Sequence, residues 1–235
     1  MTTPRAQART RTMAEILRIG RDHLATEGAA ALSLRAVARD LGVVSSAIYR
    51  YVASRDELLT LLVVDAYDEL GDAVDAAVAA ADGPVEQFRA LGRAVREWAL
   101  REPARYALLF GSPVPGYQAP AERTTEPGTR VIVRLVGILA DAYAVGALQS
   151  TDSVPVPDSL SADFSRIRTS FDIDLPDAVI ARSVLVWTGL FGTVNFDVFG
   201  QYGADTFTDE SALFEHQLSV LAETAGFVTA SQQPR

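Results

Sequence analysis

The sequence has no cysteine and no lysine, and its 235 residues include only two histidines, His23 and His216. Without cysteine, disulfides, thiolate zinc sites and cysteine nucleophiles are all excluded. Neither histidine lies in a metal-binding pattern such as HExxH or is accompanied by a matching acid or nucleophile, so we expect both to be structural. We therefore expect no metal and no cofactor.

An apolar leader is also missing. The first twelve residues, MTTPRAQARTRT, are polar and basic and lack the apolar stretch of a signal peptide. Hydrophobic residues still make up 49% of the chain and its mean hydropathy is +0.13, which is enough apolar content for a large core. These features predict a soluble, cytoplasmic protein of one or two domains.

One apolar run, residues 184–196, is apolar nearly all round a helix. A membrane span requires about 20 apolar residues, and Arg182, Asn195 and Asp197 interrupt this run earlier. We expect no membrane span. We interpret the run as a helix buried between the body of the protein and a second subunit.

Charge is distributed unevenly along the chain. The net charge is −9, which taken alone argues against a partner as negative as DNA. Residues 1–55, however, hold nine arginines against four acids, for a net of +5, and the remainder carries −14. A basic segment joined to an acidic body is the asymmetry expected of a small DNA-binding domain attached to a second domain.

Helical periodicity dominates the sequence, and signals for β-strands are nearly absent. The pattern predicts an all-α protein in which residues 1–55 form an N-terminal arm and a three-helix head, and residues 56–235 form a helical bundle. We expect Ser33 and Ser54 to cap helices, whereas Ser45 either caps a helix or contacts DNA. The proline-rich stretch 111–127 reads as an ordered loop or a mobile flap.

The most informative segment is LSLRAVARDLGVVSSAIYRYVASRDELL, residues 32–59. A short helix, a turn at Gly42 and a second short helix with a polar face form a helix-turn-helix, whose second helix can enter the major groove of DNA. The VARDLGV and AIYRYV motifs within it, and the Ser54-Arg55 junction after them, resemble the TetR family of bacterial transcriptional repressors. The body resembles the WHG-type C-terminal group of that family at Trp187 and Gly189, although Thr188 stands where that group often has histidine.

The resemblance implies roles for individual residues of the head. In the family, residues opening the recognition helix and an arginine on the preceding helix reach base edges, and an aromatic, its follower and a basic residue contact phosphates. Together with the neighbouring arginine, these positions give the candidate DNA-binding set Arg35, Ser45, Ser46, Ala47, Tyr49, Arg50, Tyr51 and Arg55. The small side chains of this helix imply little base-specific hydrogen bonding. Arg5, Arg9 and Arg11 form either a solvated tail or an arm that reaches DNA.

The family also implies a homodimer that binds a palindromic DNA operator and is released by a small-molecule effector. We expect the dimer to form through helices at 176–201 and 208–226, with candidate contacts at Val184, Trp187, Phe191, Leu218 and Leu221. We expect a mostly apolar effector pocket in the body, gated by the 111–127 loop. Its candidate residues are Trp98, Tyr106, Phe110, Tyr143, Trp187, Phe191 and Asn195.

An alternative from another class is an all-α small-molecule enzyme or carrier with an incidental basic head. Catalysis would require a nucleophile with a base, paired carboxylates or a phosphate-binding glycine loop, and the sequence contains no such pattern. DNA binding by the purified protein separates the two hypotheses. We therefore expect a transcriptional regulator rather than an enzyme.

Overall fold

The computed structural model describes residues 3–149 and 154–227. These residues form ten α-helices, two short 3-10 helices and one isolated antiparallel bridge between Leu148 and Phe227, which confirms the predicted all-α fold. The chain divides into two compact units, residues 1–69 with 101–128 and residues 70–100 with 129–235. The predicted domain boundary after residue 55 lies inside the first unit.

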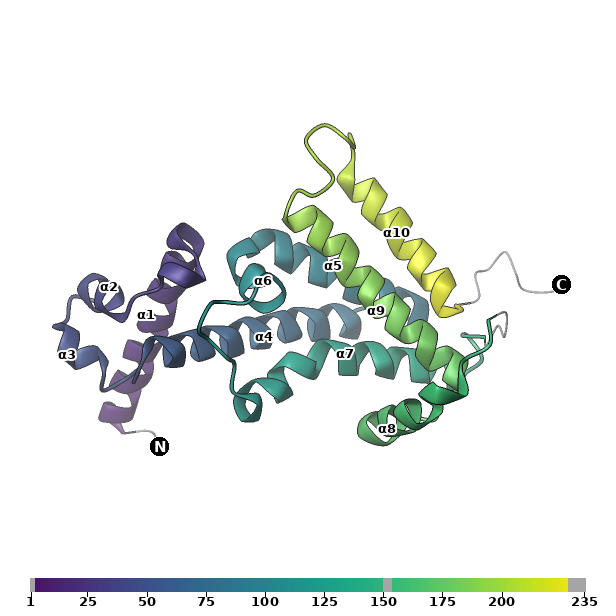
Figure 1. Ribbon diagram of the computed structural model, residues 1–235, viewed down its shortest axis with the longest axis horizontal. Coiled ribbons are helices and arrows are strands. Elements are labelled where there is room, and N and C mark those ends of the chain that lie inside the picture. Colours follow the sequence, from purple (N-terminus) through teal and green to yellow (C-terminus); the bar gives the residue numbers. More distant parts are fainter. Residues whose placement is uncertain (1–2, 150–153, 228–235) are drawn as a thin grey trace. The chain divides into compact units, whose positions relative to one another are not determined.

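The elements are distributed over the two units along the chain (Figure 1). In chain order they are α1 (Pro4–Glu27), η1 (Ala29–Ala31), α2 (Leu34–Asp40), α3 (Ser45–Ile48), α4 (Arg55–Ala79), α5 (Pro84–Arg101), α6 (Pro103–Phe110), α7 (Ala121–Ala144), η2 (Asp158–Leu160), α8 (Ser161–Phe171), α9 (Asp177–Val198) and α10 (Glu210–Ala225). The boundaries between the units fall within α4 and α7 and at the end of α5.

In the first unit, α1, α2 and α3 surround one apolar core. Ile16, Val37, Ile48 and Leu58 are completely buried there. Gly42, with φ of 76°, turns the chain between α2 and α3 in a conformation that other residues adopt only with strain. This core fixes α3 with Ile48 inward and its remaining residues toward the surface.

Helix α1 is longer than the sequence pattern predicts, because it begins at Pro4 and not near Met13. Thr3 caps it by accepting a hydrogen bond from the Ala6 N–H at 3.3 Å, and Pro4 occupies the first helical position, where its missing N–H costs nothing. The basic segment that contains Arg5 and Arg9 is therefore a helix and not an extended tail.

Helix α7 also departs from the prediction. Residues 121–127, expected to belong to a loop, form its first turns, and Pro127 lies inside the helix at the loss of one backbone hydrogen bond. Two contacts hold these turns in place: Arg123 forms an ion pair with Glu57 at 2.6 Å, and the Thr124 hydroxyl donates to the Pro120 carbonyl at 3.0 Å. The loop itself is confined to residues 111–120.

In the second unit, α5, α9 and α10 pack closely through glycines (Figure 1). A Cβ added to Gly92 would lie 2.6 Å from Leu218, and one added to Gly189 would lie 2.7 Å from Leu221. Helix α8 lies in a region of weak helical periodicity, where a short helix was expected near 162–169. It packs against α9, and the Ser161 hydroxyl at its start donates to the Asp177 carboxylate. Glycines, which have no side chain, therefore allow α5, α9 and α10 to approach one another closely.

Helix α9 corresponds to the apolar run discussed above, and its 22 residues extend further than that run. Among the described residues, it is the one helix long and apolar enough to cross a membrane by length and composition, with a window hydropathy of 1.4. About a third of that window, 33%, is buried within the subunit, and core helices of soluble proteins pass the same test. Its exposed apolar face therefore requires a cover, which we consider below.

Candidate DNA-binding surface and ligand cavity

The helix-turn-helix presents one polar face of α3 to solvent. Ser45, Ser46 and Arg50 are exposed, Tyr49 is 51% exposed and Ala47 is half-buried. The buried Ile48 anchors the helix from the opposite side. The candidate residues at the start of α3 therefore lie together on an accessible surface.

Several arginines of this region have no acidic partner. Arg5, Arg11, Arg35 and Arg50 are exposed and make no ion pair with any described residue. Two other arginines of α1 are neutralised: Arg18 pairs with Glu15 and Asp22, and Arg21 pairs with Asp65. The uncompensated charges lie on α1, α2 and the exit of α3, on the elements that the sequence assigned to DNA.

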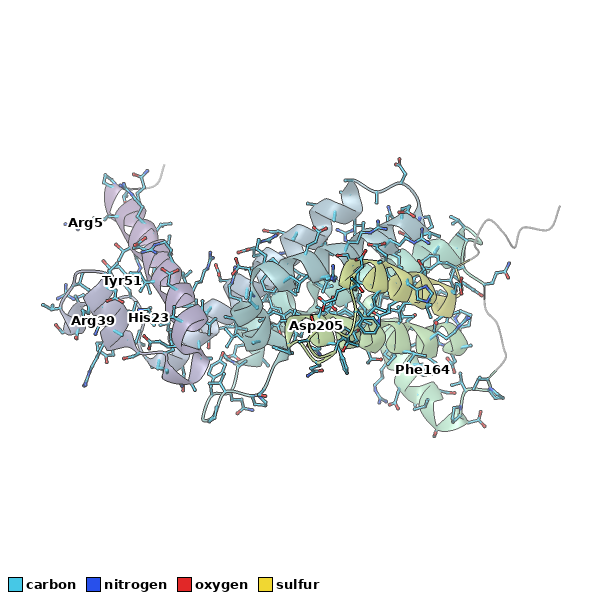
Figure 2. The ribbon with its side chains drawn as sticks, turned by 90° about the horizontal axis from the view of Figure 1, so that it is seen from above. Arg5, His23, Arg39, Tyr51, Phe164 and Asp205 are labelled. Atoms are coloured by element: carbon cyan, nitrogen blue, oxygen red, sulfur yellow. The ribbon has the colours of Figure 1, made fainter. Side chains whose placement is uncertain are left out.

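Arg9 connects the N-terminal helix to the recognition helix. Its guanidinium donates to the Arg50 carbonyl at 3.2 Å and lies 5.3 Å from the centre of the Tyr51 ring. Figure 2 shows Tyr51 beside α1, between Arg5 at the start of that helix and His23 toward its end. The cation–π contact and the hydrogen bond fix the exit of α3. No sequence pattern indicates this pairing, because Arg9 and Arg50 are forty-one positions apart in the chain.

Arg55 has internal partners that its predicted phosphate role did not anticipate. Its Nε donates to the Leu32 carbonyl at 3.2 Å, and its Nη2 donates to the Ala29 and Ala30 carbonyls at 2.8 and 3.1 Å. Arg55 therefore holds the chain that leads into α2. The phosphate role remains a prediction.

A shallow hollow lies next to Arg55 and combines polar and apolar groups. Two of the DNA-binding candidates, Arg35 and Tyr49, face it together with Arg55. Its full lining is Leu32, Ser33, Leu34, Arg35, Tyr49, Ala53, Ser54 and Arg55. Three candidates from α2, the turn after α3 and the start of α4 thus share one depression in the surface.

The histidine in the head is structural in its contacts. His23 is buried, and its Nε2 lies 2.6 Å from Asp40 Oδ2, which joins the end of α1 to the end of α2. The hydrogen bond from His23, followed by that from Arg39, lowers the pKa of the Asp40 carboxyl. This pair was not predicted, since Asp40 lies 17 positions along the chain from His23 and on a different helix.

The three predicted helix caps have different outcomes. The Ser54 hydroxyl accepts from the Glu57 N–H at 3.1 Å, which confirms the cap of α4. Ser33 occupies the predicted N-cap position of α2, but without a side-chain capping bond. Ser45 is not the cap of α3, because the helix already includes Ser45 and Val44 holds the N-cap position.

The predicted effector residues are divided between the two units. Trp98 is completely buried and Phe191 nearly so in the second unit, while Tyr143 and Asn195 are half-buried there. Tyr106 and Phe110 lie in the first unit, where their ring centres are 5.0 Å apart and burial raises the pKa of Tyr106. Their role in binding a ligand remains a prediction.

Trp187 is a member of that set that lines a cavity of the second unit. This cavity has a volume of about 230 Å³ and lies among α7, α8, α9 and the 172–176 linker. Its lining is Ile132, Val136, Ile167, Phe171, Ile173, Leu175, Ile180, Ser183, Val184 and Trp187. The one polar side chain, Ser183, donates its hydroxyl to the Val179 carbonyl at 2.8 Å. The cavity therefore offers an almost entirely apolar surface.

A trihelical head with an exposed α3 and unpaired arginines, followed by a helical body with an apolar cavity, defines a helix-turn-helix DNA-binding regulator. A family model described as "Bacterial regulatory proteins, tetR family" matches residues 16–62. A second model, described as "Tetracyclin repressor-like, C-terminal domain", matches residues 88–221. The chain belongs to the TetR family of transcriptional regulators and is not an enzyme.

Individual relatives support this assignment over the whole chain. The HTH-type transcriptional regulator Rv1816 of Mycobacterium tuberculosis is 49% identical over 225 residues, which cover 93% of this chain and 96% of the relative. The regulator Mb1846 of Mycobacterium bovis is similar to the same extent. The crystal structure of SCO4313 superimposes with a TM-score of 0.76 at 35% identity, and covers 94% of this chain and 100% of that one.

Proposed function

We propose that the protein is a repressor that binds a palindromic DNA operator as a homodimer and is released by a small neutral apolar effector. The observation that carries the DNA-binding part is the set of exposed, unpaired arginines around α3. Arginines without internal partners can bind phosphates without first breaking an ion pair. Contacts with phosphates supply most of the affinity for DNA. The protein is thus expected to act in the cytoplasm, where the chromosome is accessible.

Variants of the head test the DNA-binding roles. Tyr49→Ala and Arg55→Ala should weaken binding to all duplexes, and changes at Ser45 or Ser46 should alter sequence preference. A gel shift with the region upstream of the protein's own gene measures both. Tyr49→Phe controls for loss of the ring, and a melting curve of Arg55→Ala separates loss of contacts to DNA from loosening of residues 29–32. No binding to any DNA at low salt would refute the function.

The exposed face of α9 and α10 supports a dimer. Leu185, Phe196, Phe199 and Val220 are between 41% and 57% exposed. Nothing lies within 4 Å of a Cβ added to Gly192, on the same helix. Two such faces packed as a four-helix bundle would remove these side chains from water. Of the contacts expected from the sequence, Val184 is exposed, whereas Phe191 and Leu218 are buried in the subunit and cannot meet a partner directly.

Two glycines on α9 provide a matched test of the dimer. Gly192→Glu places a charge on the open face and should give a folded monomer by light scattering at micromolar concentration. Gly189→Ala instead crowds Leu221 within the subunit and should lower the melting temperature while the protein stays dimeric. A wild-type monomer, or a Gly192→Glu dimer of unchanged affinity, would reject this interface.

The cavity among α7, α8 and α9 supports an apolar effector. Its walls contain no charged side chain, so an ionised ligand would lose its hydration without compensation. Effector release requires that the ligand bind the DNA-free conformation more tightly than the DNA-bound one. Trp187 and Gly189, which carried the WHG-type resemblance, lie on the helix that forms one wall.

Variants that change the volume of this cavity test whether the effector binds there. Neutral apolar compounds that abolish the gel shift should lose affinity for Val136→Phe and Phe171→Ala. The fully buried Trp98, where Trp98→Phe keeps an aromatic ring, serves as a control outside this cavity. If effectors are found whose affinity is unchanged by the first two variants, the effector binds elsewhere.

A further inference from the structure

Val44 is an exposed apolar side chain at the start of the recognition helix. Its side chain belongs to the residue at the N-cap of α3, and the residue is 72% exposed. The neighbouring Ser45 and Ser46 are small and exposed as well. The isopropyl group of Val44 is therefore more exposed than that of its neighbour Val43, which is 37% exposed.

This valine contributes little to the stability of the head. An N-cap residue normally accepts a hydrogen bond from a free backbone N–H through a side-chain oxygen, and valine has none. In the described structure α3 accordingly has no side-chain capping bond. Thr3, Ser54 and Asp209 cap α1, α4 and α10 with their side chains, whereas α2, α6, α8 and α9 have no side-chain capping bond either. Val44 thus combines an uncapped helix start with exposed apolar surface, and departures from local rules occur at functional positions.

The major groove offers one apolar feature to such a group. Each thymine carries a 5-methyl group on the groove edge, and cytosine, guanine and adenine present hydrogen-bonding atoms there. Serines next to Val44 are short enough to let the isopropyl group approach a base edge. An apolar residue without hydrogen-bonding capacity discriminates thymine through this methyl group.

We propose that Val44 is a specificity-determining residue that contacts the 5-methyl group of one thymine in each operator half-site. The inference rests on the proposed DNA binding. It specifies which chemical group of the DNA is recognised at one position. This matters because the small residues of α3 offer few base-specific hydrogen bonds. It also explains why a helix start exposed to solvent has a β-branched apolar residue.

Replacement of thymine by deoxyuridine tests the contact, because it removes the methyl group and leaves base pairing intact. An operator is first selected with the wild-type protein from a library of random duplexes, and each of its thymines is then replaced in turn. Burial of one methyl group corresponds to an affinity loss of about fourfold per half-site, and about sixteenfold when both half-sites are changed. We expect this loss at one symmetry-related thymine and in the wild type alone.

Two variants of Val44 separate recognition of the methyl group from the stability of the head. Val44→Ala should bind the thymine and deoxyuridine operators equally. Val44→Ser should raise the melting temperature by about 3 °C through a restored N-cap and should lose the same methyl dependence. Val145 is 73% exposed in the second unit, and Val145→Ala should leave both properties unchanged.

The outcomes distinguish this inference from the proposed function. If no duplex is selected at any salt concentration, the proposed DNA binding fails. If operators are selected but no deoxyuridine weakens binding, or if Val44→Ala and Val44→Ser keep the wild-type dependence on the methyl group, the role of Val44 is overturned while DNA binding stands.

Discussion

Arginine has opposite surroundings in the helix-turn-helix region and in the second unit. In residues 3–55, Arg5, Arg11, Arg35 and Arg50 are exposed without an ion pair in the described structure. In the second unit, seven described arginines pair with an acid, and Arg182 donates to the Gln149 carbonyl at 3.0 Å. These pairs include Arg89–Glu86, Arg93–Glu215, Arg96–Asp197, Arg130–Asp75, Arg134–Asp75, Arg166–Asp163 and Arg168–Asp177.

The difference shows that net charge is a weak guide to a binding surface. The chain carries −9 overall, yet its candidate DNA-binding face is distinguished by arginines that have no acidic partner among the described residues. Arginine pairs with acids in the second unit, whereas the exposed arginines of the head remain available to a partner. The following variants test each half of this contrast.

The largest effect is expected from Arg35→Ala combined with Arg50→Ala. If each arginine neutralises one phosphate per protomer, a dimer loses four contacts, and the slope of log affinity against log salt falls by about 3.6. Affinity at physiological salt should fall about a thousandfold for all sequences. Gel shifts over a salt series measure both values.

An arginine pair of the second unit serves as the control. Arg166→Ala removes the exposed pair with Asp163, whose side chains are 72% and 50% exposed, and should leave the salt slope unchanged. An equal drop in slope for both variants would mean that the bulk charge, and not the unpaired face, determines affinity.

The next effect concerns an internal pair of the second unit. Arg96 and Asp197 are 2.5 Å apart, with side chains 13% and 3% exposed, and Arg96 also lies 4.9 Å from the Phe214 ring centre. Asp197→Ala leaves the guanidinium buried without its carboxylate and should cost about 3 kcal/mol of unfolding free energy. Chemical denaturation of the full chain measures it, and Asp163→Ala should cost under about 0.5 kcal/mol.

A smaller effect is expected where an arginine of the head does have a partner. Arg9→Ala removes the contact with the Tyr51 ring and should cost about 1 kcal/mol of stability, because the pair is exposed. A double-mutant cycle with Tyr51→Ala should show that the two losses do not add. Arg11→Ala combined with Tyr51→Ala should be additive, and additivity in both cycles would remove the assigned contact.

The smallest effect is a pH dependence within the head. The hydrogen bond from His23 lowers the pKa of Asp40, so this carboxylate stabilises the fold above its unfolded pKa and loses that contribution as the pH falls through its folded pKa. Asp40→Asn should therefore lower the melting temperature at pH 6 more than at pH 3. Asp141→Asn, at an exposed position, should change both equally.

Apolar periodicity predicted most of the helices. It missed segments whose helical structure depends on a cap or on contacts rather than on an apolar stripe. Helix α9 was expected at 176–201 and lies at Asp177–Val198, because its apolar stripe sets its limits. The first turns of α1 have no such stripe and form through a cap and good helix formers, so periodicity missed them. Pro127 marked a loop by its residue type, yet contacts with Glu57 keep the helix around it.

The exposed face of α3 was more predictable than the cavity. Polar residues on a short helix anchored by the buried Ile48 face solvent, so the exposure of Ser45, Ser46 and Tyr49 could be expected, and their contact with DNA stays a prediction. The cavity is lined by ordinary aliphatic residues such as Ile132 and Ile167, whose sequence pattern is that of a packed core. Aromatic content pointed instead to Trp98, which is completely buried.

The two tryptophans give the molecule a built-in optical readout. Trp187 lies in the cavity wall, with its ring centre 4.3 Å from that of Phe191, and Trp98 is completely shielded from water. Indole emission responds to the polarity around the ring, so an occupant of the cavity would change the fluorescence of Trp187 and leave Trp98 as an internal reference. Titration of the unlabelled protein, followed by its intrinsic emission, then reports occupancy without any attached dye.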